Sequence, residues 1–195
     1  MLQARGAGPA MTSIRKRDLP VERTRCFLEP GPVLLLCTAW KGERAIMTLG
    51  WHMMLGYDLV GTYLWDANHS HALARRSREC TLNLPTAGLL DAVVGIGNCS
   101  SRDVDKFDRF GLTATPSREV RAPSIGQCHA SFECRLHETR ITREYPLFVW
   151  RVLRVRAARS PALPRTAHYR GGGRFMLSGD EVSRRRQFRP DMLDQ

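Results

Sequence analysis

A loop rich in small residues lies in the middle of the chain, where it could hold a phosphate group. Residues 95–100 read Gly-Ile-Gly-Asn-Cys-Ser and approach the GxGxxG fingerprint of dinucleotide-binding proteins. That fingerprint needs a strand before it and a long helix after it, whereas here the preceding run has helical spacing and the following helix is short. We therefore exclude a Rossmann site. Beside Ser101, Arg102 and Lys106, the loop is either a phosphate site or a plain surface turn.

Two histidines flank a serine at the start of a short expected helix over residues 68–77. Free backbone N–H groups and the helix dipole favour an anion at such a position, so Asn68, His69 and Ser70 could bind one. A bare helix cap is the alternative interpretation. We expect no metal at His69 and His71, because no carboxylate or cysteine cluster accompanies them.

An apolar strand over residues 44–51 is interrupted by the small residues Thr48 and Gly50. Glycine in a strand often marks a place where a ligand or another backbone comes close. The segment is therefore either one wall of a ligand site or a core strand with a bulge.

These candidates need a scaffold of short strands. Short helices are expected over residues 68–77, 86–96 and 103–110. Successive strands are joined too closely for the crossovers of a doubly wound sheet, which leaves a mainly β fold, a small β-barrel with short helical connections. Apolar runs and period-two alternation predict strands over residues 33–40, 44–51, 59–65, 79–84, 129–141 and 147–157, the first three forming an antiparallel meander.

The net charge of +11 on 195 residues invites a nucleic-acid interpretation. Of this excess, +7 falls in residues 151–195, where 11 Arg face four acidic residues. Basic residues interleaved with aromatic ones are sparse elsewhere, which disfavours RNA binding. Residues 1–20 are expected to be a loose basic tail without the apolar stretch of a secretory signal, and no run is long enough to span a bilayer. These features favour the cytoplasm and exclude a membrane partner.

The six cysteines show neither a CxxC pair nor zinc-finger spacing, so we expect free thiols. Five of them have apolar or strand-like neighbours and are expected in the core. Cys99 lies in a turn-like sequence, where its thiol could be exposed.

A succession of motifs along the chain resembles the flavin reductase-like family of FMN-binding split barrels. The resemblance runs from about Cys26 to Met192, and the order and spacing of the motifs carry it. The segments 168–171 and 183–186 are most similar to the flavoredoxin-like branch. The resemblance implies a dimeric, FMN-binding split β-barrel over residues 21–195. The motifs are residues 46–51, 68–71, 83–85, 100–107, 111–112, 122–123, 132–134 and 147–150.

The resemblance also implies which residues hold FMN. The apolar wall and polar edge for the flavin ring would come from two strand ends, and the phosphate would lie at the helix start with support from the later loop. His168 and Tyr169 would lie near the ring or a nicotinamide. The implied cofactor-binding residues are Met47, Thr48, Leu49, Gly50, Trp51, Asn68, His69, Ser70, Asn83, Leu84, Pro85, Ser101, Arg102 and Lys106.

The activity implied by the resemblance is that of an NAD(P)H-dependent flavin reductase, or of a flavoredoxin-like electron carrier. A homodimer would pass electrons to a small molecule or a protein, and no catalytic side chain is needed because FMN carries the chemistry. The choice between NADH and NADPH, the acceptor, and whether FMN is a tight cofactor or an exchangeable substrate stay open. The alternatives are a basic nucleic-acid-binding β-barrel without redox activity, and a split barrel that binds another ligand such as haem.

Overall fold

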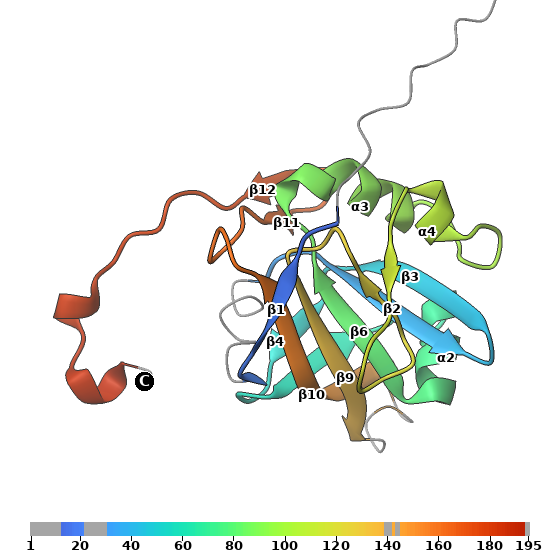
Figure 1. Ribbon diagram of the computed structural model, residues 1–195, viewed down its shortest axis with the longest axis horizontal. Helices are drawn as coiled ribbons and strands as arrows, with labels where there is room; N and C mark the ends of the chain where they lie inside the picture. Colours follow the sequence, from blue (N-terminus) through green and yellow to red (C-terminus); the bar gives the residue numbers. More distant parts are fainter. Residues whose placement is uncertain (1–12, 22–30, 139–141, 143–144, 194–195) are drawn as a thin grey trace, which may run out of the picture.

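An antiparallel sheet of eight strands forms the body of the protein in the computed structural model, which describes residues 13–21, 31–138, 142 and 145–193 (Figure 1). Its strands follow the order β3-β2-β6-β9-β10-β5-β4, and β1 pairs with β10 off this path. Two short hairpins, β7–β8 and β11–β12, lie outside the sheet. The sheet strands are β1 (Lys16–Leu19), β2 (Leu34–Trp40), β3 (Glu43–Leu49), β4 (His52–Met54), β5 (Leu59–Tyr63), β6 (Glu79–Leu84), β9 (Ala130–Glu138) and β10 (Leu147–Ala158).

Short helices occupy the connections, as the sequence predicts. The helix expected over 68–77 is α2, and the one expected over 86–96 begins as a 3-10 turn and continues as α3. The helix expected over 103–110 is shorter, because the Asp105 side chain caps α4 by accepting from the backbone N–H groups of Phe107 and Asp108. The helical segments are α2 (His69–Ser77), η2 (Ala87–Leu89), α3 (Leu90–Gly97), α4 (Lys106–Arg109), η3 (Arg185–Gln187) and η4 (Pro190–Met192).

Alternation along the central strands gives the sheet two apolar faces. On β6, Leu82 and Leu84 point into one cluster with Phe132 and Trp150. On β2, Leu35 and Cys37 enter a second cluster, which α3 and α4 cover with Val93, Ile96 and Phe107. A strand with apolar side chains on both faces reads as a near-continuous apolar run, which is why β2 is visible in the sequence. β6 instead alternates, with Cys80, Leu82 and Leu84 in the first cluster and buried polar side chains on its other face.

The meander expected from the first three strands is only partly formed. β2 and β3 make an antiparallel hairpin, but β5 pairs with β10 and β4 rather than with β3. The reason is a corner at Gly50 and Trp51, after which the chain starts β4 at the other end of the sheet order. Because β3 and β4 are the two terminal strands yet lie only three residues apart in the chain, the sheet must curl until its edges meet at this corner.

Part of the expected N-terminal tail belongs to the sheet. Residues 16–19 form β1, with Lys16 opposite Ala158 and Leu19 opposite Val155 of β10. The charged sequence Lys-Arg-Asp-Leu concealed this strand, since three of its four side chains are polar. The charged side chains of β1 contact the rest of the protein: Asp18 pairs with Arg154 at 2.6 Å, and the Lys16 Nζ donates to the carbonyl of Ile125 at 2.7 Å.

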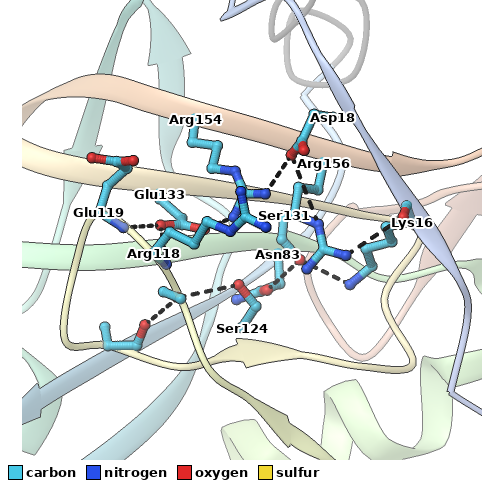
Figure 2. A network of polar contacts seen from close by, with 12 residues as sticks. Lys16, Asp18, Asn83, Arg118, Glu119, Ser124, Ser131, Glu133, Arg154 and Arg156 are labelled. Atoms are coloured by element: carbon cyan, nitrogen blue, oxygen red, sulfur yellow. Dashed lines mark hydrogen bonds and ion pairs between the residues drawn. The ribbon is translucent and has the colours of Figure 1, made fainter.

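A buried polar network lies between the sheet and the segment that follows α4 (Figure 2). The Lys16 Nζ donates to the Ser131 hydroxyl at 2.9 Å, and that hydroxyl donates to the Asn83 side-chain oxygen at 2.9 Å. Glu133, 3% exposed, accepts from the backbone N–H groups of Arg118 and Glu119 and pairs with Arg154. These polar contacts fix a long connection onto the sheet, in addition to the apolar contacts of Leu112 and Ile125 in the second cluster.

Burial of the Lys16 ammonium predicts a stability that rises with pH. Burial lowers the pKa of Lys16 from 10.5 to about 8. Between those values the unfolded chain binds a proton that the folded protein has released, so the free energy of unfolding increases with pH. Relative to Lys16→Met, the wild-type protein should gain up to about 3 kcal/mol across this window.

Urea unfolding at about pH 7.5 and about pH 10 measures this difference. Arg17→Met, an exposed change on the same strand, is the control and should follow the wild-type protein. Equal pH dependence in Lys16→Met and the wild-type protein would contradict the assignment.

The described cysteines are free thiols, in line with the sequence prediction. Cys37, Cys80, Cys128 and Cys134 are buried, and Cys99 is partly exposed. Cys26 lies outside the described residues. Burial raises the pKa of Cys128 to about 12, so its thiol stays protonated near neutral pH.

Two short hairpins were not expected from the sequence, and one of them, β11–β12, lines the site described next. β11 (Ala167–Tyr169) pairs with β12 (Phe175–Leu177), and the turn between them contains three glycines with positive φ, Gly171 to Gly173. β7 (Ala114–Thr115) pairs with β8 (Ser124–Ile125), and β8 lies against β6 and β9 of the main sheet. Strands of two or three residues are too short to show a periodic pattern.

Candidate functional site

An open pocket of about 840 Å³ lies at the corner where β3 ends. Its walls come from four places: the end of β3, the segment from Tyr63 to Asn68, the helix α3, and the β11–β12 hairpin. The volume falls within the range that suits a cofactor or a drug-sized ligand. Because the pocket lies where the two edges of the sheet meet, the same corner that the meander prediction missed creates the site.

The end of β3 forms one wall, and all five residues singled out there from the sequence line the pocket: Met47, Thr48, Leu49, Gly50 and Trp51. The Thr48 hydroxyl donates to the Val93 carbonyl at 2.6 Å, which ties β3 to α3 on the opposite wall. A Cβ built on Gly50 would meet no atom within 4 Å. The absent side chain at position 50 therefore leaves open space in the pocket.

Aromatic rings surround the mouth of the pocket. Trp51 packs at 5.2 Å from Tyr63, and Tyr169 packs at 5.1 Å from Phe175 across the hairpin. Trp51 is 70% exposed, Trp65 61% and Tyr169 55%, although all three line the pocket. Large flat side chains left in solvent around a cavity suit a planar aromatic ligand.

Sequence reasoning found Trp51 and Tyr169 but missed Tyr63, Trp65 and Phe175. A signal for two of these was present, because in the strand expected over residues 59–65 successive side chains point to opposite faces. Thr62 and Leu64 are buried, whereas Tyr63 and Trp65 fall on the outward face. Two aromatic side chains on the solvent side of a strand indicate a binding surface. Phe175 gave no such signal, since its hairpin is too short.

The N-terminus of α2 opens toward the same pocket. Asn68, the N-cap residue, lines the pocket and makes no side-chain capping hydrogen bond, and the first turn contains no acidic residue. Ser70 is only 3% exposed, and His69 lies 3.4 Å from the Glu43 carboxylate. A first turn left uncapped, with a buried hydroxyl beside it, can receive an anionic group.

Ser101 and Lys106 support the pocket from behind. β3 is a terminal strand, and the Ser101 hydroxyl accepts from the Ile46 N–H at 3.2 Å, while the Lys106 Nζ donates to the Ile46 carbonyl at 2.9 Å and to the Ile96 carbonyl at 2.8 Å. The two side chains thus replace a missing neighbouring strand. Burial lowers the pKa of Lys106. Arg102 is exposed and lines neither described pocket.

Residues 83–85 and His168 lie away from this pocket. The Asn83 side chain is fully buried in the polar network, and Pro85 is buried as well. Leu84 and His168 line a second pocket of about 830 Å³, beside the loop that runs from Pro161 to Arg165. Tyr169 faces the first pocket and its neighbour His168 the second, as alternation along β11 requires.

A second histidine lies directly behind the aromatic wall. The His52 ring donates its Nε2 proton to the Pro32 carbonyl at 2.6 Å, and its other ring nitrogen is buried without a hydrogen-bond partner among the described residues. Burial lowers the pKa of His52. The imidazole next to Trp51 braces the segment just before β2.

None of the helices in the described part of the chain has the length and apolar composition that crossing a bilayer requires.

Residues 26–175 match the model of a protein family described as the flavin reductase like domain. An uncharacterized protein of Archaeoglobus fulgidus is 31% identical over 112 residues, which make up 56% of this chain and 63% of that protein. The chain thus spans less than two thirds of that relative.

Solved structures share the fold over almost their full length. The FMN-binding domain of a flavin reductases-like enzyme from Shewanella baltica superposes with a TM-score of 0.80, at 20% identity, over 88% of this chain and 98% of that one. Flavoredoxin of Desulfovibrio vulgaris gives a TM-score of 0.71, at 18% identity, over 95% and 97%. At these identities the likeness concerns the fold, and it confirms the mainly β split barrel.

Proposed function

Because the chain belongs to the flavin reductase-like family, we propose that it is an FMN-binding oxidoreductase whose flavin occupies the pocket at the end of β3. The observation that carries this proposal is the meeting of aromatic walls with an uncapped helix N-terminus in one cavity. A flavin ring needs flat apolar walls, and its ribityl phosphate needs N–H groups and hydroxyls.

The residues present fit the parts of FMN. Trp51, Trp65 and Tyr169 offer ring faces, and Met47 and Leu49 provide apolar contact below them. Asn68, His69 and Ser70 would receive the phosphate at the start of α2. Ser101 and Lys106 act indirectly by holding β3, and Arg102 contributes positive charge from outside the pocket. In this assignment Asn83, Leu84 and Pro85 support the barrel rather than touch the flavin.

FMN, when bound, supplies hydride and single-electron chemistry. The protein then has three tasks: to hold the ring, to keep one face open for NADH or NADPH and for the acceptor, and to limit access of water. The exposed rings of Trp65 and Tyr169 suit the second task, since they can stack on a planar donor. The supported activities are flavin reduction by NAD(P)H and electron transfer in the manner of a flavoredoxin.

The exposed apolar surface around β4, beside the pocket, favours a homodimer. β4 is a terminal strand with one unpaired edge, and the apolar side chains around it are exposed: Trp51 by 70%, Met53 by 59% and Leu55 by 48%. Monomeric proteins rarely leave so continuous an apolar area in water. A second copy over this edge would bury it and narrow the mouth of the pocket.

Visible absorbance of the purified protein, together with titration of the apoprotein with FMN, tests the proposed function. A yellow protein, or micromolar binding of added FMN, is expected; a colourless protein that does not bind FMN would overturn the proposal. With FMN bound, steady oxidation of NADH or NADPH in the presence of free flavin identifies a reductase. Retained FMN without such turnover identifies an electron carrier.

Replacing Ser70 with alanine should weaken FMN binding while leaving the fold intact. Loss of one hydrogen bond to a charged group costs about 1–2 kcal/mol, or roughly a 5- to 30-fold rise in the dissociation constant. Quenching of FMN fluorescence during titration measures the dissociation constant. Ser77→Ala, a buried serine at the other end of α2 that bonds to the Glu79 backbone, is the matched control and should bind FMN normally. An unchanged constant in Ser70→Ala removes Ser70 from the phosphate site.

A further inference from the structure

The last segment of the chain leaves the barrel and extends to one side of it (Figure 1). Its final anchor is Ser178, whose N–H donates to the Thr166 carbonyl at 2.9 Å and whose hydroxyl accepts from the Thr166 N–H at 2.8 Å. Residues 182–193, the C-terminal arm, then form two short 3-10 turns. Among the described residues, the arm's hydrogen bonds and its one ion pair are internal, as between Gln187 and Arg184 or Arg189 and Asp191.

The arm carries large apolar side chains that have nothing of their own chain to pack on. Val182 is 68% exposed, Phe188 56% and Met192 60%. Fixing the backbone of a residue costs about 1–2 kcal/mol in conformational entropy, which only burial or hydrogen bonding elsewhere can offset. An ordered arm therefore needs a surface supplied by another molecule.

The same chain exposes an apolar surface that lacks a cover. This aromatic patch comprises Trp51, Met53, Leu55, Tyr63 and Trp65, all on or beside the β4–β5 edge. Its members are in contact: Trp51 packs on Tyr63, and a Cβ on Gly61 would touch both Leu55 and Met53. Trp51, Tyr63 and Trp65 also line the pocket, so whatever covers the patch stands at its mouth.

We propose that the C-terminal arm crosses to a second copy of this chain and lies on that copy's aromatic patch, closing its flavin pocket in trans. One chain carries both the protruding apolar segment and the uncovered apolar surface, so a two-fold pair satisfies both at once and then stops growing. Any other partner would have to match the two surfaces separately. The flavin part of this inference rests on the proposed function, whereas the exchange of arms does not.

The length and charge of the arm agree with this exchange. Twelve residues span up to about 40 Å when extended, more than the radius of gyration of about 16 Å expected for a domain of this size. Arg184, Arg185 and Arg186 are exposed on it and form no ion pair among the described residues. Placed at a partner's pocket, they would add positive charge where a phosphate-bearing donor enters.

Photo-crosslinking distinguishes exchange from folding back. The probe is the full chain with Phe188 replaced by p-benzoylphenylalanine, prepared once in natural isotopes and once labelled with ¹⁵N, then mixed and irradiated. Crosslinked peptides that join a light arm to a heavy segment within residues 51–65 are expected. Attachment within the same chain, attachment to another surface, or absence of any crosslinked pair would overturn the proposal.

Truncation after Glu181 supplies an independent measurement. Because the arm contributes no hydrogen bond to its own barrel among the described residues, the free energy of unfolding at high dilution should be unchanged. The dimer dissociation constant, measured by sedimentation, should rise about tenfold or more, and the FMN dissociation constant should rise with it. An unchanged dimer constant contradicts the exchange. If the protein binds no FMN, the proposed function fails while the crosslink and the dimer constant still decide the role of the arm.

Discussion

Replacing Asn83 with leucine is expected to lower the free energy of unfolding by about 3–5 kcal/mol. The Asn83 side chain is inaccessible to solvent and makes bonds in four directions. Its oxygen accepts from the Ile125 N–H at 3.0 Å and from the Ser131 hydroxyl at 2.9 Å, and its nitrogen donates to the Leu35 carbonyl at 3.1 Å and to the Thr81 hydroxyl at 3.0 Å. Leucine has similar size but leaves these buried groups without a partner, each at a cost of about 1–3 kcal/mol.

Urea unfolding of Asn83→Leu measures this loss, and FMN titration of the folded fraction separates two roles for the residue. We expect the FMN dissociation constant to stay within about twofold of the wild-type value, because Asn83 does not line the pocket. Asn98→Leu, an exposed asparagine that does line it, is the matched control and should change stability by less than about 0.5 kcal/mol. Lost FMN affinity with unchanged stability in Asn83→Leu would instead make Asn83 a flavin contact.

The case of Asn83 shows where sequence reasoning stops. The alternating pattern of residues 79–84 predicts β6 with correct bounds, since the apolar residues Cys80, Leu82 and Leu84 recur with the period of a strand. Which strand lies beside it, and which loop covers it, depend on pairings with residues far away in the chain, such as Ile125 and Ser131. A polar residue at the end of an apolar strand looks the same in a sequence whether it faces a ligand or an internal network.

Other positions show a local sequence signal that coincides with the pocket. The interruption of an apolar strand by Thr48 and Gly50 is a local feature, and both residues line the cavity. The expected meander was wrong about β5, which pairs with β10 and β4 instead of β3. The two-residue corner after β3 redirects the chain, and its effect on strand pairing does not show in the sequence. Trp65 therefore reaches the pocket through a topology that periodicity does not encode.

The arrangement of charge also weakens the nucleic-acid alternative. Among the described residues, four arginines of the basic segment 151–195 pair with acidic side chains: Arg151 with Asp58, Arg154 with Glu133, Arg156 with Asp18, and Arg189 with Asp191. Paired cations contribute little to the binding of a polyanion. The arginines of this segment for which the described residues show no acidic partner are divided between the C-terminal arm, with Arg184, Arg185 and Arg186, and the stretch before it, with Arg159, Arg165, Arg170 and Arg174.

Substitution of Gly50 by tryptophan is expected to raise the FMN dissociation constant by about 100-fold or more, equivalent to about 2.8 kcal/mol. Ile46 packs in the second apolar cluster with Val93 and Ile96, and the Thr48 hydroxyl donates to the Val93 carbonyl, so both side chains point toward α3. Alternation directs the side chain of residue 50 to the same face. No atom lies within 4 Å of the position that its Cβ would take. Because Gly50 lines the pocket, an indole built outward from this open position would take up volume that the flavin needs.

Because that space is open, Gly50→Trp should block the flavin while keeping the free energy of unfolding within about 1 kcal/mol of the wild-type value. Gly88→Trp provides the matched control: Gly88 is exposed, lines neither described pocket, and has ordinary room around its Cβ, with the Thr86 hydroxyl at 3.6 Å. FMN titration and urea unfolding of both variants separate occlusion from misfolding. Normal FMN affinity in a folded Gly50→Trp would place the flavin elsewhere, and the second pocket beside His168 would then become the cavity to test, since it alone of the two would remain unfilled.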